Sequence, residues 1–250
     1  MKKLIVASAL AVTMLTGLAT SPKVQASSSA KSAKVSFNAK VSFKQYKINK
    51  KYNNGIKANY YFNLPQLKGN SAAIKKINKD LLKKYKSTSY TTSKGIFVYA
   101  KNPSKSTNVK NVTFYDITKT SVSYNKNSII SFKVSKNWWA GYQNNKKNVP
   151  YQAIGGWTYS LKSGKLLSIT DTAKGNKASI QKKLNAGMMK YFGVKKSEKN
   201  FLYDIYLIYY LKSGKLYLYP DIIETLNPEF TQHNPPIYYN SHFTIESRYK

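Results

Sequence analysis

The stretch from Ser71 to Tyr85, SAAIKKINKDLLKKY, decides the fold of the first half of the chain. Its apolar side chains recur every three or four residues, the spacing of one helix face, and lysines fill the positions between them. The Ser71 hydroxyl is positioned to cap the first turn. The stretch therefore predicts an amphipathic helix with one packed face and one cationic face. The apolar positions are Ile74, Ile77, Leu81, Leu82 and Tyr85.

Strand patterns precede this helix. The pentapeptide AKVSF occurs at Ala33–Phe37 and again at Ala39–Phe43, and in both copies apolar residues alternate with polar ones. A second strand is predicted from Ile56 to Leu64, where Pro65 is expected to stop it because proline lacks the amide hydrogen that a strand interior needs.

Alternation returns after the helix, from Ile96 to Val134, and includes Phe97 and Tyr99. Asn125-Lys126-Asn127 is expected to be a hairpin turn between the last two strands of this stretch. The first half thus predicts strands, a helix and an antiparallel meander.

The second half repeats this order. Strands are predicted at Tyr151–Leu161 and Leu166–Ile169, and Asn176 is placed to cap a helix over Lys177–Phe192. The following Gly193 is expected to end that helix in a left-handed conformation. The helix face consists of Ile180, Leu184, Met188, Tyr191 and Phe192.

A nearly continuous apolar run follows, FLYDIYLIYYL at Phe201–Leu211, which predicts a strand buried on both faces with Lys215–Tyr219 as its hairpin partner. The hexapeptide LKSGKL occurs at Leu161–Leu166 and again at Leu211–Leu216. In each copy a glycine, Gly164 or Gly214, supplies the positive φ that a tight hairpin requires. The two copies are explained either by convergent turn chemistry or by a duplicated unit.

We therefore expect an α+β fold of antiparallel meander sheets, in which each half carries one amphipathic helix packed on its sheet. The two halves are residues 35–136 and 137–250. The serine- and lysine-rich residues 27–34 are expected to be a flexible linker.

The first 26 residues have the parts of a secretory signal peptide: Lys2 and Lys3, an apolar stretch from Leu4 to Leu18, and the small-residue site Val24-Gln25-Ala26. Cleavage after Ala26 is expected, and a retained signal that anchors the chain is the alternative. No later stretch reaches the roughly 18 apolar residues that a membrane span needs. These features predict a secreted protein associated with a cell wall of the Gram-positive type.

Charge is the strongest compositional feature, with 42 Lys plus Arg against 9 Asp plus Glu and a formal net charge of +33. The absence of cysteine excludes disulfides, so a packed core must stabilise the chain. Lysine neutralises polyanions without the planar fork that makes arginine a specific phosphate reader. We expect retention on anionic wall polymers such as teichoic acids, without specific recognition of nucleic acid. A lysine-rich surface without a ligand is the alternative.

Aromatic rings stack on sugars, so Trp138, Trp139, Tyr142 and Trp157 are candidate glycan contacts, with core packing as the alternative. The rings of Trp138 and Trp139 cannot both point to one side of a strand. Gly155 and Gly156, like the two turn glycines, are assigned a turn or structural role.

Catalytic patterns are sparse. The histidines His233 and His242 have no zinc-site spacing, and Gly155-Gly156 is not followed by the Gly-Lys-Ser/Thr of a phosphate loop. We therefore expect a protein without catalytic residues, metal or cofactor; a hydrolase is an alternative.

The stretch from Ala153 to Asp171 resembles the glycine pair, strand, turn and aspartate that open the extracytoplasmic domain DUF3298. The helix at Lys177–Phe192, the second LKSGKL hairpin and Leu218–Ile223 are similar to the later part of that domain. Tyr61–Leu67, before the first helix, resembles DUF4163, which commonly precedes DUF3298. The resemblance covers about Val41 to Ile245.

Relatives in this family include the sensor part of a lysozyme-binding anti-sigma factor and the non-catalytic part of a peptidoglycan deacetylase. This chain departs from both. An anti-sigma factor needs a cytoplasmic domain before its membrane helix, where this chain has only Lys2 and Lys3, and a deacetylase needs a catalytic domain afterwards, where this chain stops at Lys250. Trp157 also follows the glycines where the family has Ala-His. Lysozymes are basic and would be repelled by this chain. The resemblance thus implies a free-standing, non-catalytic binding protein, with a lysozyme-binding protein as an alternative. The high lysine and tyrosine content without cysteine leaves a surface-layer-like structural protein as a second alternative.

Overall fold

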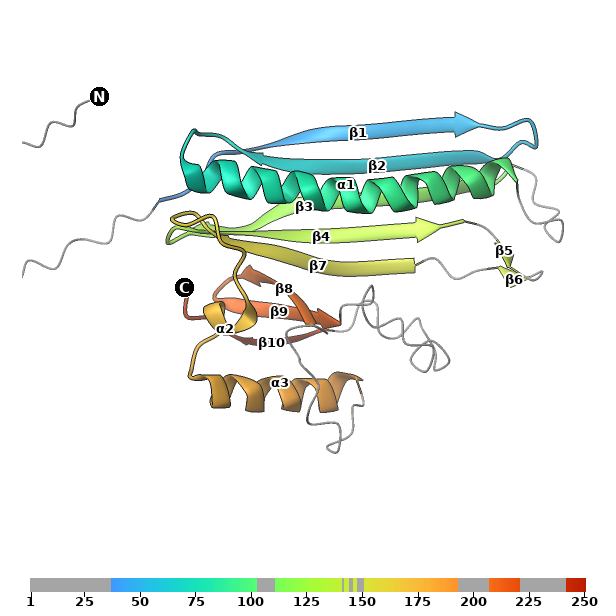
Figure 1. Ribbon diagram of the computed structural model, residues 1–250. Coiled ribbons are helices and arrows are strands. Elements are labelled where there is room, and N and C mark those ends of the chain that lie inside the picture. Colours follow the sequence, from blue (N-terminus) through green and yellow to red (C-terminus); the bar gives the residue numbers. More distant parts are fainter. Residues whose placement is uncertain are drawn as a thin grey trace, which may run out of the picture. The chain divides into compact units, whose positions relative to one another are not determined.

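The computed structural model describes residues 37–102, 111–140, 142–143, 146–147, 151–192, 207–220 and 242–250. They form a five-stranded sheet, a three-stranded sheet, a two-stranded ribbon of β5 (Tyr142–Gln143) and β6 (Lys146–Lys147), and helices (Figure 1). The predicted α+β class is confirmed. The predicted signal peptide and linker, residues 1–34, lie outside the described residues. None of the helices within the described ranges is both long and apolar enough to cross a membrane.

The larger sheet has the strand order β1-β2-β3-β4-β7. All neighbours are antiparallel except β2 and β3, which are parallel and are joined by helix α1, which packs on them (Figure 1). Two parallel strands need such a crossover connection, so the predicted antiparallel meander is corrected to a mixed sheet. The strands are β1 (Val41–Lys51), β2 (Lys57–Leu67), β3 (Thr113–Lys126), β4 (Ile129–Trp139) and β7 (Tyr151–Ser160), and α1 is Ala72–Lys101.

Helix α1 begins as predicted, because the Ser71 hydroxyl accepts a hydrogen bond from the Ile74 amide at 3.2 Å. The helix is longer than expected and ends at Lys101, so the strand predicted around Phe97 and Tyr99 is wrong. Ile96 and Ala100, four residues apart, are buried on the core side, while Tyr99 is exposed. This spacing of buried residues is that of a helix and not the alternation of a strand.

Pro65 lies inside β2, opposite Phe43, and does not stop the strand. The Lys68 amide donates to the Lys40 carbonyl of the strand's antiparallel neighbour, so in this alternating ladder the Pro65 nitrogen faces away from β1. On that other side the pairing with β3 ends at Phe62, and the Asn63 side-chain amide bonds to the backbone of Thr120. No ladder bond is therefore lost at Pro65.

Strand β1 is an edge strand of the described sheet. Its exposed side chains include four lysines. Charged edges are a common device against pairing with another chain. The four are Lys44, Lys47, Lys50 and Lys51.

The hairpin between β3 and β4 turns at Asn127-Ser128, so only Asn127 of the predicted turn Asn125-Lys126-Asn127 belongs to it. Both residues have positive φ, 54° and 58°, as a two-residue turn of this hand requires. Strand β7 pairs with β4, so the sheet draws on residues from both sides of position 137.

The strand predicted at Leu166–Ile169 is wrong beyond its first residue. A single bridge joins Leu166 to Tyr159, and the chain then enters the short helix α2 (Ile169–Thr172). The Ser168 and Asp171 side chains form a capping box, which satisfies amides that a strand would leave to a neighbour.

Helix α3 (Lys177–Phe192) matches its prediction. The Asn176 side chain accepts from the Ser179 amide at 2.9 Å, and Ile180, Leu184 and Met188 are buried. Gly193 and the side chains of the last two helical residues lie outside the described part of the chain.

The smaller sheet has the order β10-β9-β8 and is antiparallel. One face of this sheet shares a hydrophobic core with α3. The prediction that Lys215–Tyr219 is the hairpin partner of the apolar strand is confirmed, because β9 pairs with β8. The first six residues of the predicted apolar strand, 201–206, are not among the described ones. The strands are β8 (Leu207–Lys212), β9 (Lys215–Pro220) and β10 (Phe243–Glu246).

The two LKSGKL copies form different turns. In the second, Ser213 and Gly214 have φ of 48° and 72° and close a two-residue hairpin. In the first, Gly164 has a φ of 69° and the turn packs on the start of α1, where a Cβ at Gly164 would lie 2.7 Å from the Ala73 carbonyl oxygen. Packing, and not the hexapeptide alone, selects the turn.

Gly155 and Gly156 have a structural role, but inside β7 and not in a turn. A Cβ at Gly156 would lie 2.6 Å from the Tyr210 Cβ and 2.7 Å from the Tyr209 carbonyl oxygen of β8. At the same contact the Leu211 amide donates to the Ser131 hydroxyl of β4 at 2.9 Å. The glycine lets the smaller sheet approach the backbone of the larger one.

Tyr209 links β8 to the loop before α2, and the titration of its hydroxyl is expected to make the stability of the fold depend on pH. Its hydroxyl donates to the Leu167 carbonyl at 2.7 Å, and burial raises the pKa of the phenol well above its ordinary value of 10.0. Below pH 10 the tyrosine is neutral in both states and its hydrogen bond stabilises the fold. Above that pH the unfolded tyrosine ionises while the folded one does not, so its stabilisation is lost.

We therefore expect Tyr209→Phe to lower the free energy of unfolding by about 1 kcal/mol at neutral pH, with the difference from the parent shrinking as the pH rises above about 10. Urea unfolding of both proteins at several pH values measures this difference. A difference that stays constant up to about pH 11 would contradict it.

Candidate anion-binding site

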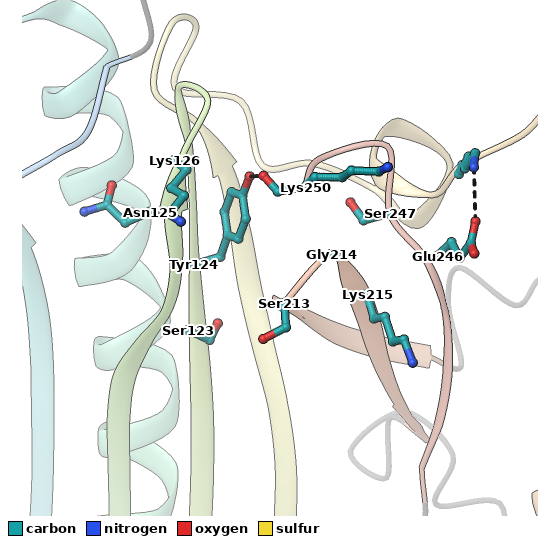
Figure 2. Close-up of a pocket in the computed structure, with 11 residues that line it drawn as sticks. Ser123, Tyr124, Asn125, Lys126, Ser213, Gly214, Lys215, Glu246, Ser247 and Lys250 are labelled. Carbon is teal, nitrogen blue, oxygen red and sulfur yellow. Dashed lines mark hydrogen bonds and ion pairs between the residues drawn. The ribbon is translucent and has the colours of Figure 1, made fainter.

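A pocket of about 620 Å³ opens where the β3–β4 hairpin, the β8–β9 turn and the C-terminal residues meet (Figure 2). Four of its lining residues are lysines that come from four separate segments, and one is acidic. The remaining lining residues are small or hydrogen-bonding. The lining residues are Ser123, Tyr124, Asn125, Lys126, Lys174, Ser213, Gly214, Lys215, Glu246, Ser247 and Lys250.

Positive-φ turns place two of the lysines. Lys126 directly precedes the Asn127-Ser128 turn, and Lys215 directly follows Gly214. Lys126 is the last residue of β3 and Lys215 is the first residue of β9, so the two turns bring both residues to the lining of the pocket (Figure 2).

Tyr124 holds the C-terminal residues against the β3–β4 hairpin. Its hydroxyl donates to the Lys250 backbone oxygen at 3.0 Å (Figure 2). The same hydroxyl accepts from the Asn127 side-chain amide at 2.9 Å. Burial raises the pKa of the Tyr124 phenol, which keeps the hydroxyl protonated as a donor. The hydrogen bond therefore fixes Lys250 at the pocket.

Arg248, the only arginine, has a structural role. Its backbone amide donates to the Thr172 carbonyl at 2.9 Å, and its guanidinium donates to the Ala173 and Thr170 carbonyls at 3.1 and 3.0 Å. These carbonyls lie at the end of α2, where a helix leaves acceptors without partners. The cationic groups that line the pocket are thus all lysines.

The pocket already stabilises one negative charge. Glu246 lies 3.3 Å from the Lys174 ammonium, and the pKa of its carboxyl is lowered by that hydrogen bond, with the charges of Lys174, Lys183 and Lys250 adding to the effect. The carboxylate is exposed, so an external anion would meet the same ammonium groups in water.

Each acidic side chain among the described residues lies close to a lysine. Asp80 pairs with Lys84 at 3.7 Å and Asp171 with Lys165 at 3.1 Å. Asp116 pairs with Lys136 at 3.9 Å, and Glu246 with Lys174 as above. The surface of the described part therefore presents ammonium groups in excess and no acidic patch.

Two of the predicted aromatic contacts, Trp138 and Trp139, lie outside the pocket. Trp139 is 8% exposed and packs edge-on against Phe114 with ring centres 5.6 Å apart, whereas Trp138 is half-buried and meets Tyr99 at 6.4 Å. The two rings thus differ in burial, as expected for adjacent strand residues. The structure does not bring either into the pocket.

Trp157 of β7 is half-buried, with the Lys84 ammonium 5.7 Å from its ring centre. Tyr142 belongs to β5, and its side chain lies outside the described set. Trp157 does not line the pocket.

His242 stacks on Tyr219 with ring centres 5.1 Å apart, and His233 falls outside the described residues. Within the ranges that the structure describes, no group of three or more metal-ligating side chains is present.

Sequence reasoning missed the pocket lysines. The turn signals at Asn127 and Gly214 are visible in the sequence, but 42 cationic residues give no local signal that singles out four of them. The four lysines are singled out only by the tertiary contact of the two turns with the C-terminal residues.

No protein-family model matches the sequence, and no curated protein matches it. Two solved structures of DUF3298 family proteins are similar to this one. That from Bacteroides fragilis has a TM-score of 0.47 and 12% identity over 83% of this chain and 89% of its own. That from Pseudomonas aeruginosa has a TM-score of 0.46 and 9% identity over the same shares, 83% and 89%. Both are described as members of DUF3298, the family that the sequence from Ala153 to Ile223 resembles.

Proposed function

We propose that this protein is a secreted, non-catalytic, cell-envelope-associated protein that binds anionic wall polymers through the lysine-lined pocket. The observation that carries the proposal is the gathering of four lysines from four segments around one concave surface whose single acidic side chain, Glu246, is already paired.

Phosphate-rich polymers suit such a surface. Ammonium groups are compact point charges that neutralise phosphates, and the release of condensed counterions drives tight binding at low salt. The same mechanism makes binding weaken steeply as salt rises. It retains the protein on a polymer without requiring recognition of one repeat.

A basic protein partner such as lysozyme fits less well. Like charges slow association and oppose docking, and every described acidic side chain already lies near a lysine. An anionic polymer meets no such opposition.

The test compares two triple variants with the same loss of formal charge. One changes the pocket lysines Lys126, Lys215 and Lys250 to Gln, and the other changes the exposed α1 lysines Lys75, Lys79 and Lys83 to Gln. Sedimentation with teichoic-acid-bearing walls is measured across a salt titration. We expect the slope of log affinity against log salt to fall by about three for the pocket set and by less than about one for the α1 set.

Two further measurements complete this test. Glu246→Gln is expected to raise affinity about twofold to threefold, because it removes a like charge and releases Lys174. An equal loss of affinity in both triple variants would show that the pocket is not the binding site. Salt-insensitive binding to walls stripped of teichoic acid would exclude the ionic mechanism.

A further inference from the structure

A second concave surface lies between β1 and the last turns of α1. It is a groove of about 510 Å³ lined by Ile48, Lys50, Tyr52, Phe97, Val98, Lys101 and Asn102. Two large apolar side chains in it are unusually accessible, Val98 at 58% exposed and Ile48 at 41%. Adjoining exposed apolar side chains in a concavity are typical of a ligand-binding groove.

Cationic groups stand at the edge of this apolar surface. The Lys50 ammonium lies 5.1 Å from the centre of the Phe97 ring, whose face attracts it and holds it at the groove. Lys101 lies in the last turn of α1, where its charge offsets the negative end of the helix dipole. No lining residue is acidic.

We propose that this groove binds one anionic amphiphile. Its hydrocarbon chain lies on Ile48, Phe97 and Val98, and its acidic head group pairs with the Lys50 ammonium, with Lys101 close by. The volume falls in the range of about 300–1,000 Å³ that small-molecule sites occupy.

The charge pattern favours this occupant over other apolar ligands. A neutral or cationic amphiphile would bury the same chain but leave the two ammonium groups without a counter-charge. A small inorganic anion would pair with the ammonium groups but leave Val98 and Ile48 in water. Only a molecule with both parts matches both halves of the surface.

This site shares no lining residue with the lysine-lined pocket. Its test is therefore independent of the wall-binding proposal, and either one can fail alone.

The experiment titrates the folded protein with single-chain probes below their micelle concentrations, by calorimetry. Dodecyl phosphate is expected to bind, decyl phosphate about 16-fold more weakly, because each buried methylene is worth about fourfold in affinity. Dodecyl maltoside and dodecyltrimethylammonium are expected to bind at least about tenfold more weakly than dodecyl phosphate. Inorganic phosphate is expected not to displace it.

Two pairs of matched variants locate the site. Val98→Asn is expected to weaken the binding of dodecyl phosphate at least about tenfold. Val122→Asn, at an exposed position on β3 outside the groove, is expected to leave this affinity unchanged. Lys50→Gln is expected to reduce the preference for the phosphate over the maltoside head group, and Lys119→Gln on β3 is not. Circular dichroism verifies that each variant is folded.

Equal effects of Val98→Asn and Val122→Asn would overturn the proposal, as would equal affinity for all three dodecyl head groups. Binding to phosphatidylglycerol vesicles without binding to monomeric dodecyl phosphate would also overturn it, and would assign the surface to a membrane instead.

Discussion

Replacing Lys136 with methionine is expected to lower the free energy of unfolding by about 3 kcal/mol, because it removes the ammonium group that pairs with the buried carboxylate of Asp116. Asp116 is 0% exposed and lies on β3 beside Tyr60 of β2. Its carboxylate is 3.9 Å from the Lys136 ammonium of β4. A carboxylate buried away from an opposite charge is among the most costly single changes in a core.

Lys136 itself is held in an unfavourable setting. Burial lowers the pKa of its ammonium, and the charge of Asp116 opposes that shift. Each charge of the pair therefore stabilises the other. The two residues differ in exposure, because 14% of the Lys136 side chain but only 1% of the Asp116 side chain is exposed. Asp116→Asn alone lets the lysine extend to water and is expected to cost only about 1 kcal/mol.

Urea unfolding of four proteins tests this pair: the parent, each single variant and the double variant Asp116→Asn with Lys136→Met. The double variant is expected to recover most of the loss of Lys136→Met, because no charge is then left buried. Lys119→Met, at an exposed position on β3, is the matched control and is expected to stay within about 0.5 kcal/mol of the parent. A Lys136→Met variant as stable as that control would refute the prediction.

Replacing Gly156 with alanine is expected to lower the free energy of unfolding by about 3 kcal/mol, because the methyl group has no space between the two sheets. The new Cβ would lie 2.7 Å from the Tyr209 carbonyl oxygen and 2.6 Å from the Tyr210 Cβ, and would also meet the Phe132 carbonyl oxygen. Two of these neighbours are backbone atoms that cannot rotate away. The smaller sheet would have to move as a whole.

Gly95→Ala is the matched control for this change. Gly95 lies inside α1, where an added Cβ would meet, among the described side chains, only the Tyr99 ring at 3.9 Å, an ordinary contact. Alanine in a helix interior is expected to raise the free energy of unfolding by about 1 kcal/mol relative to glycine. Thermal unfolding of both variants would show opposite shifts of the midpoint, and shifts of the same sign would contradict the close approach at Gly156.

Local signals predicted much of the fold. Ser71 and Asn176 start their helices with the expected hydrogen bonds, and Gly214 closes its hairpin with a positive φ. These features depend on a few neighbouring residues, so the sequence contains them. The errors occurred where tertiary contacts decide, as at Phe97, where a short apolar stretch fits a strand or a helix equally well.

Pro65 and the pocket show two other reasons for failure. Pro65 is tolerated because a neighbouring strand ends its pairing at Phe62, which depends on residues more than 50 positions away. The pocket lysines gather because the C-terminal residues bind the hairpin at Tyr124. Neither contact produces a periodic pattern in the sequence. The three tryptophans of the glycan hypothesis are conspicuous in the sequence, but they do not line the pocket.

The lysines of edge strand β1 have a consequence for crowding. If many copies gathered on one polymer, exposed strand edges would be brought to concentrations at which sheets of neighbouring copies could join. The ammonium groups of Lys44, Lys47, Lys50 and Lys51 make each edge repel its counterpart on another copy. The same charge that favours attachment to a polyanion would then keep the attached molecules dispersed.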